Sequence, residues 1–452
     1  MKKLHYIVLS TILFVGLFYH ETIGVNLSLF ALFLAIMTIY KTPKKYKTQS
    51  FWVSFLGTLI ASFAFAWYGD FVSFLALFCS LVLLDYQTKS PRLNVLLAIP
   101  VFMTNQFTFL CRFFTFADWL PRKRKKGMGQ KIIALVVIPL LFIAVFVGVY
   151  SMGSTHFADL FINFKWDFDF KSFLWLFLLG FFIAFNYWNF SVQKVFYQTN
   201  YYLISDFRKK PTPLSTWSFM DLDAERMSGV VSLVMLNILT AFFVITFNYE
   251  LFYETTKSAT ELSLETHERV NAVILSIVMV ILLILFYFKS YFNFDKKAKI
   301  LKRLAYSWLV INMILILSTM LKNTEYIYHF GMTYKRWGVY AFLSLALFGL
   351  IFTMLKIHNQ KTNAYLFTQM VWSFYVLIML IGVVNWGGIS TQYNIEHKKG
   401  NYTFLRSLDY NHQLLKEHFP HQYENTVDYR AKASQKASFL SKALYYETID
   451  EE

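Results

Sequence analysis

A strongly basic stretch sets the expected orientation of this chain. Between Arg112 and Lys131 the sequence reads RFFTFADWLPRKRKKGMGQK, in which seven of 20 residues are Lys or Arg. Long apolar segments lie on both sides of it. Moving clustered positive charge across a bilayer is costly, and the membrane potential opposes it. We therefore expect this stretch to lie on the cytoplasmic face of a membrane, and it orients the neighbouring segments.

The composition predicts a membrane protein. Hydrophobic residues make up 56% of the 452 residues and charged residues 15%, whereas a soluble domain has about 25% charged residues. At least eleven apolar runs occur, and each is continuous rather than alternating, which excludes a transmembrane β-barrel. We expect an all-α, polytopic transmembrane helical bundle with about 11 spans, one interfacial or re-entrant segment and a short helical C-terminal tail.

The net charge of +16 does not indicate nucleic-acid binding. The positive charges gather in short loops between apolar runs, where they orient the spans and contact anionic lipid headgroups. The two cysteines, Cys79 and Cys111, form no C-x-x-C pair, so neither redox chemistry nor a zinc site is indicated. We expect no cofactor and no metal.

Eleven apolar segments are the expected spans. They are residues 4–19, 25–40, 51–68, 71–84, 132–150, 172–190, 230–247, 270–288, 304–321, 339–355 and 366–384. With the N-terminus in the cytoplasm, 28 of the 43 Lys and Arg residues fall in inside segments, 7 in outside loops and 8 in the tail. This asymmetry favours a cytoplasmic N-terminus and an extracytoplasmic C-terminus in the inner membrane of a bacterium.

Residues 93–111 are the ambiguous segment. They are apolar but contain Asn94, Pro100 and Asn105, and a crossing here would place the basic stretch outside. We therefore expect an interfacial or re-entrant segment. The expected divisions are 1–111 (first hairpins), 112–131 (basic loop), 132–384 (seven spans) and 385–452 (polar tail). Within the tail, the spacing of apolar residues predicts helices over 403–419 and 431–446.

The polar residues near the middle of the spans are uncharged: Asn186, Asn237, Asn312 and Gln369. Hydrogen bonds between helices explain them, at about 0.6 kcal/mol each, and a solute path lined by them is the alternative. The lack of central carboxylates and the low usage of Gly and Pro argue against an ion-coupled carrier with broken helices.

Two outward segments carry residues that suit chemistry. His267, Glu268 and Arg269 stand at the start of a span, either as an acid/base or ligand site or as ordinary helix-entry residues. His329, Thr333 and Arg336 surround a turn at Gly331. Eight of the ten histidines face outward in this topology, but none has the spacing of metal ligands. No catalytic motif is present.

Short motifs resemble a family of bacterial multi-pass membrane proteins known only as a domain of unknown function. They are VNLSLF at 25–30, IPLL at 138–141, HFGMTYKR at 329–336, YNI at 393–395 and LDY at 408–410. The family often has Asn-Pro-Asp where this chain has Asn385, Trp386 and Gly387, so no role for that carboxylate carries over. The resemblance implies an architecture and no activity.

We expect residues 250–269, 326–336 and 385–419 to pack together as an outward polar cap. Its candidate functional residues are His267, Glu268, Arg269, His329, Thr333, Arg336, Asn385, Asn394 and Asp409. The expected role is interaction, sensing or assembly in the envelope, with an envelope protein as partner. A small-solute transporter is the alternative, and a membrane-embedded enzyme comes third.

Overall fold

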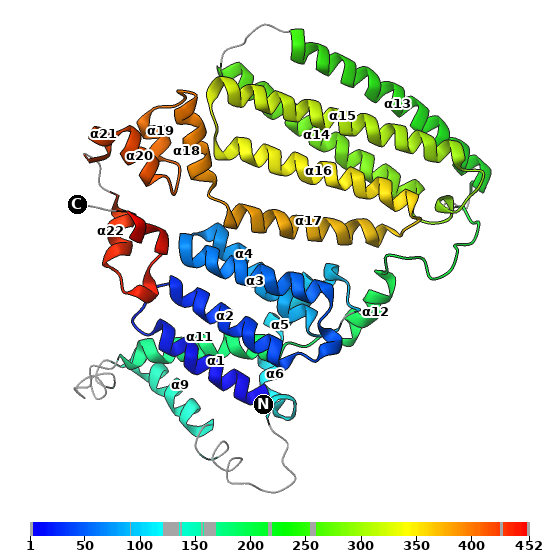
Figure 1. Ribbon diagram of the computed structural model, residues 1–452. Helices are drawn as coiled ribbons and strands as arrows, with labels where there is room; N and C mark the ends of the chain where they lie inside the picture. The colour runs from blue at the N-terminus through cyan, green and yellow to red at the C-terminus, as the bar shows by residue number, and fades with distance from the viewer. Residues whose placement is uncertain are drawn as a thin grey trace. The chain divides into compact units, whose positions relative to one another are not determined.

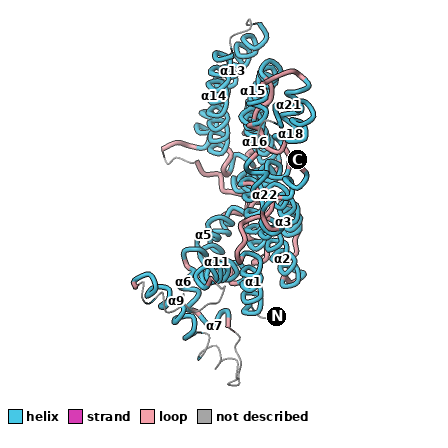
Figure 2. The backbone as a smooth tube through the Cα atoms, turned by 90° about the vertical axis from the view of Figure 1, so that its left-hand side faces the viewer, coloured by secondary structure: helices cyan, strands magenta, loops and turns pink. Residues whose placement is uncertain are grey.

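The computed structural model describes residues 3–90, 92–120, 135, 138–154, 157, 169–215, 219–253, 259–424 and 428–449. Within these residues helices are joined by loops and turns, and no strand is present (Figure 2). The all-helical class predicted from the sequence is therefore confirmed. The centre of the basic stretch, 121–131, lies outside the described residues, so its placement stays a prediction.

The chain forms two compact units. The first contains residues 1–92, 98–193 and 430–448. Its main helices are α1 (Lys3–Phe18), α2 (Val25–Lys41), α3 (Gln49–Tyr68), α4 (Phe71–Gln87), α5 (Ala98–Phe107), α6 (Phe109–Phe114), α7 (Phe116–Trp119), α9 (Ile138–Gly153), α11 (Phe170–Trp188) and most of α22 (Tyr429–Lys436) (Figure 1). Short 3-10 helices cover Lys44–Tyr46, Phe439–Ser441 and Leu444–Thr448.

In the first unit, α1 packs against α2 and α11, and α3 packs against α2 and α4. Local sequence explains where these helices begin. Asp70 starts α4, because its carboxylate accepts a hydrogen bond from the backbone N–H of Ser73 at 2.8 Å. Asp169 starts α11 in the same way through the backbone N–H groups of Lys171 and Ser172.

The second unit contains residues 93–97, 194–429 and 449–452. Its helices are α12 (Lys194–Tyr202), α13 (Leu222–Tyr253), α14 (Ala259–Tyr287), α15 (Lys299–Phe330), α16 (Tyr334–His358), α17 (Asn363–Val383), α18 (Trp386–Glu396), α19 (Tyr402–Arg406), α20 (His412–His418) and α21 (Pro420–Glu424). Short 3-10 helices cover Val95–Leu97 and Tyr291–Asn293. Helix α15 packs against α13, α14 and α16, and α17 packs against α16.

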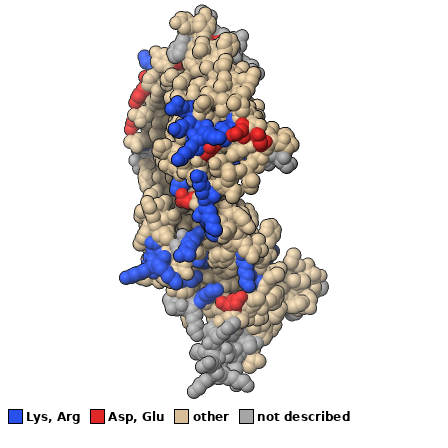
Figure 3. Space-filling view, turned by 90° about the vertical axis from the view of Figure 1, so that its right-hand side faces the viewer, with Lys and Arg blue, Asp and Glu red and all other residues tan. Residues whose placement is uncertain are grey.

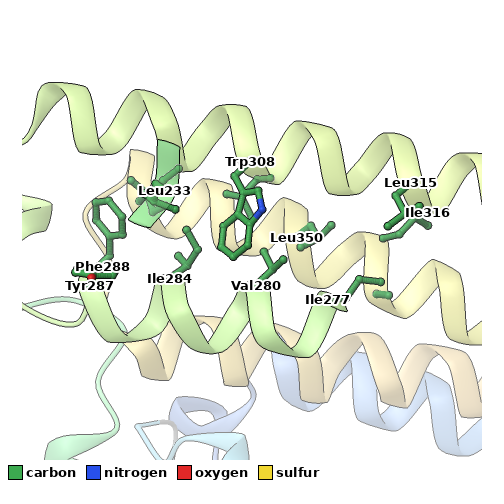
Figure 4. Close-up of a cluster of buried hydrophobic side chains, with 14 of the residues drawn as sticks. Leu233, Ile277, Val280, Ile284, Tyr287, Phe288, Trp308, Leu315, Ile316 and Leu350 are labelled. Carbon is green, nitrogen blue, oxygen red and sulfur yellow. The ribbon is translucent and has the colours of Figure 1, made fainter. Parts of the chain in front are cut away.

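The core of the second unit lies among α13, α14, α15 and α16. Leu233, Ile284, Trp308 and Leu350, one from each helix, are buried together (Figure 4). Between membrane helices such contacts act through close packing, because lipid tails are as apolar as the side chains themselves. The indole N–H of Trp308 donates to the hydroxyl of Thr240 at 2.9 Å, so its polar atom is satisfied within the core.

Ten of the expected spans coincide with helices of the structure, and the described part of the eleventh, 132–150, lies in α9 from Ile138 onward. Six helices are long and apolar enough to cross a membrane: α3, α11, the 222–250 part of α13, α15, α16 and α17. Several other apolar helices are shorter, and the 16 residues of α1 reach only about 24 Å. The helices are those of a multi-pass membrane protein. Helix length alone does not establish the expected count of about 11 spans.

Two segments differ from a simple helix pattern. Residues 93–111 are divided into a 3-10 turn, α5 and α6, and the 10 residues of α5 reach only about 15 Å. In the tail, the expected continuous helix over 403–419 is wrong, because the chain breaks into α19 and α20. Tyr410 lies between them with a positive φ of 56°, which a helix cannot accommodate. The expected helix over 431–446 stops at Lys436.

Candidate functional site

The polar tail is joined to the turn between α15 and α16 by Asn394 of α18. Its Oδ1 accepts from the backbone N–H of Met332 at 2.6 Å, and its Nδ2 donates to the backbone oxygen of Met332 at 2.9 Å. Gly331 has a φ of 81°, and a Cβ there would lie 2.3 Å from Asn394 Oδ1. Only glycine permits this approach, so the turn and the asparagine depend on each other.

Arg336 is a buried part of the same turn. Only 8% of its surface is exposed, its guanidinium donates to the backbone oxygen of Gly331, and it lies 4.0 Å from the centroid of the Tyr326 ring. Thr333 begins α16 by accepting from the backbone N–H of Arg336 at 3.4 Å. These contacts give the cation a role in holding the turn.

Asn385 and Asp409 extend the network into the tail. Asn385 begins α18 by accepting from the backbone N–H of Gly388 at 2.7 Å, and it donates to the backbone oxygen of Tyr410 at 2.8 Å. The hydroxyl of Tyr334 accepts from the backbone N–H of Asp409 at 2.9 Å and donates to its carboxylate at 3.3 Å. The structure thus places Thr333, Arg336, Asn385, Asn394 and Asp409 together, and their role as a functional site stays a prediction.

The other outward candidates are placed less closely. His267, Glu268 and Arg269 belong to α14, but their side chains lie outside what the structure describes, so the packing of 250–269 in the cap stays a prediction. His329 is exposed at the end of α15, beside the ring of Tyr328. Among the described residues, no group of three or more His, Cys, Asp or Glu side chains is arranged to hold a metal ion.

The asparagines of the second unit join helices along α15. Asn237 of α13 donates to the backbone oxygen of Leu304 at 3.0 Å. Asn312 accepts from the hydroxyl of Ser276 on α14 at 3.4 Å. Gln369 is half-buried on α17. The two asparagine contacts and the Trp308–Thr240 bond lie on successive turns of α15, as expected for hydrogen bonds that hold helices together.

Asn186 has a partner that the sequence did not suggest. Arg112 of α6 donates to Asn186 Oδ1 at 2.5 Å and to the backbone oxygen of Asn189 at 2.7 Å. Asn105 of α5 makes two further hydrogen bonds with the backbone of Ser191, at 2.8 and 2.9 Å. Asn105 of α5 and Arg112 of α6 therefore fix these two helices to the end of α11 by polar contacts. The sequence feature that could have predicted these contacts is the presence of two polar residues, Asn105 and Arg112, in an apolar run.

The last part of the tail, residues 430–448, belongs to the first unit. The carboxylate of Glu21 accepts from the hydroxyls of Ser438 and Ser441, and these hydrogen bonds lower the pKa of Glu21. The backbone N–H of Val25 donates to the backbone oxygen of Lys442 at 3.1 Å. A Cβ on Gly24 would lie 2.4 Å from the carbonyl carbon of Ser441. The tail is thus in direct contact with the turn between α1 and α2.

Comparison with known proteins gives a family and no activity. A family model described as a domain of unknown function, DUF4153, matches residues 28–416. No curated protein and no solved structure matches the chain. The family resemblance inferred from the short motifs is confirmed.

Proposed function

The chain belongs to the DUF4153 family, and we propose that it is an assembly protein of the bacterial envelope, with its folded tail outside the inner membrane as the surface for a partner protein. The observation that carries this proposal is that each part of the tail is hydrogen-bonded within its own unit. Residues 385–429 are bonded to the α15–α16 turn, and residues 430–448 to the α1–α2 turn. Each part of the tail is therefore held in place on its own unit.

The tail contacts also support the expected topology. Helix α1 runs from Lys3 to the turn that carries Glu21, and the tail binds that turn. If α1 crosses the membrane, the N-terminus and the tail lie on opposite sides, which requires an odd number of spans. Eleven spans satisfy this requirement, and a twelfth crossing at 93–111 does not.

The charges of the second unit fit the same orientation. Exposed Lys289, Lys296, Lys297 and Lys299 lie around the connection from α14 to α15, at the opposite end of these helices from the α15–α16 turn and α18 (Figure 1). Figure 3, which views that end, shows Lys and Arg side chains gathered over it. Positive charge of this kind favours the cytoplasmic face.

The described side chains favour interaction over transport. Asn237 and Asn312 are hydrogen-bonded between helices, whereas the tail exposes large apolar groups. Tyr429 is 81% exposed and Phe439 63% exposed. Aromatic residues are enriched in protein interaction sites relative to the rest of a protein surface. The transporter alternative rests on the Oδ1 of Asn237, which is buried and has no hydrogen-bond partner among the described residues.

Cysteine labelling tests the orientation first. Lys432→Cys and Lys45→Cys are introduced separately into a protein whose Cys79 and Cys111 are replaced by serine, since both lysines are exposed. An impermeant thiol reagent should label residue 432 in intact cells and residue 45 only after lysis. Labelling with the opposite pattern, or of both sites in intact cells, would refute the outward tail.

A crosslinking experiment then tests the partner surface. A photoreactive residue at Phe439 should give one discrete protein adduct in cells. The matched control is Phe63 of α3, which is 67% exposed and is expected to face lipid. The adduct should be lost in Gly24→Ala, which displaces the tail from its turn. An adduct that persists in this variant, or equal adducts at both sites, would contradict the proposal.

A further inference from the structure

Three cations from separate helices of the first unit converge on the end of α11. Arg112 of α6 donates to Asn186 Oδ1 and to the backbone oxygen of Asn189, at 2.5 and 2.7 Å. Lys3 of α1 donates to Asn189 Oδ1 at 3.0 Å. Lys41, the last residue of α2, donates to the backbone oxygen of Trp188 at 3.0 Å.

Lys89, just after α4, adds a fourth cation. Its ammonium lies 5.2 Å from the centroid of the Phe190 ring and interacts electrostatically with Lys3 and Lys41. We refer to Lys3, Lys41, Lys89 and Arg112 as the α11 cation cluster. Its members come from four elements that are far apart in the sequence, so the fold itself holds these like charges together.

Nearby negative charge offsets the cluster only in part. Asp85, which is 5% exposed, pairs with Lys89 at 2.9 Å, and Asp118 attracts Lys3. The ends of α2, α4 and α11 add partial negative charge, about half a unit each. The four cations still outnumber the two carboxylates, and Nε of Arg112 is buried without a hydrogen-bond partner among the described residues. A bound anion would relieve the remaining repulsion.

The surroundings of the cluster are apolar and exposed. Phe107, Leu110 and Phe114, which lie on or beside α5 and α6 close to Arg112 in the sequence, are 86%, 64% and 60% exposed. Tyr40, next to Lys41, is 77% exposed. Cations at helix ends beside exposed aromatic and aliphatic side chains are typical of the headgroup region of a bilayer.

We propose that the α11 cation cluster binds the phosphate group of an anionic phospholipid, whose acyl chains lie against the exposed apolar residues of α5 and α6. A phospholipid headgroup and a free phosphate ion would be recognised in the same way, because in both cases ammonium and guanidinium groups bind a phosphate oxyanion. A free phosphate would satisfy the cations equally, but it would leave the apolar residues uncovered. The site is on the first unit at the end away from the tail, so it is independent of the proposed partner surface.

Lipid binding to the purified full-length protein tests the site. Native mass spectrometry in a non-ionic detergent would measure the affinity for phosphatidylglycerol and, separately, for phosphatidylcholine. The test variant is Lys3→Gln with Lys89→Gln. The matched control is Lys44→Gln with Lys45→Gln, because both are exposed lysines after α2 that make no contact with the cluster in the described structure. A thermal melt of each variant checks that it is folded.

We expect the test variant to bind phosphatidylglycerol about tenfold more weakly, and the control variant to change by less than twofold. Phosphatidylcholine should bind weakly to all three proteins. Equal weakening in both variants would show a diffuse charge effect and overturn the proposal, as would no change in either.

Competition with inorganic phosphate shows whether the site binds a lipid headgroup or a free phosphate ion. If millimolar phosphate displaces phosphatidylglycerol from the wild type but not from the test variant, the site takes free phosphate and the lipid assignment is wrong. If the double variant does not stay folded, Lys3→Gln alone is compared with Lys44→Gln. Lys3 is exposed at the start of α1, and its loss should weaken lipid binding about threefold.

Discussion

Asn394→Ala should open the turn between α15 and α16. The change leaves the backbone N–H and the backbone oxygen of Met332 without their partner, and Met332 is only 8% exposed. A buried backbone group without a partner costs about 1–3 kcal/mol. Two unpaired groups, partly hydrated by water that enters the space, lower the free energy of opening this turn by about 3 kcal/mol. That free energy corresponds to roughly a hundredfold change in the opening equilibrium.

Hydrogen–deuterium exchange of the full-length protein in detergent measures this opening directly. In Asn394→Ala, the amide of Met332 should exchange about a hundredfold faster than in the wild type. The matched control is Asn401→Ala, which removes an exposed cap that accepts from the backbone N–H of Phe404 at 2.9 Å. Loss of this cap should destabilise α19 by about 1 kcal/mol, and the exchange rate of the Met332 amide should not change.

Two outcomes would refute the reasoning. Unchanged exchange at Met332 in Asn394→Ala would mean that the side chain does not hold the turn. An equal increase in Asn401→Ala would mean that the tail loosens as a whole, whichever asparagine is removed.

Three further predictions concern the tail and the helix contacts. Gly24→Ala should speed proteolysis of the tail at Lys442, because the added methyl group meets the backbone of the tail, whereas Gly16→Ala, with open space around it, should not. The lowered pKa of Glu21 means that its contribution to tail attachment is complete above the ordinary value of 4.5 and is lost as the pH falls through the lower folded value. Amide exchange at Val25 should therefore become faster at low pH than expected for a stable contact, and Glu21→Gln should remove this pH dependence. Asn237→Leu should change the free energy of unfolding by only about 0.6 kcal/mol, and a much larger loss would contradict a simple packing role.

Hydropathy was enough to locate the helices. Within the described residues the expected spans lie on helices, because an apolar run long enough to enter a membrane must satisfy its backbone hydrogen bonds internally. The interruption of 93–111 could also be anticipated from Asn94, Pro100 and Asn105. The break at Tyr410 could not, since the apolar spacing of 403–419 fits a continuous helix and gives no sign of a residue with positive φ.

Contacts between distant residues were the main features that the sequence did not reveal. Asn394 and Asp409 do contact Met332 and Tyr334 in the turn that carries Thr333 and Arg336, and the expected topology, which puts the turn and the tail on one face, was the reason to group them. No feature of the sequence predicted the hydrogen bond between Ser441 and Thr22, which are 419 positions apart. The convergence of Lys3, Lys41, Lys89 and Arg112 was equally hidden, because charge counts place these residues on one face without giving their distances.

The contact of Ser441 with Thr22 also sets the order in which the protein can be completed. Ribosomes add about 5–20 residues per second, so the 419 positions between these residues correspond to a delay of roughly 20–80 s. During that time the first hairpin has its helices but not the segment that covers its turn. In the nascent chain the turn between α1 and α2 therefore stays uncovered until Ser441 has been added.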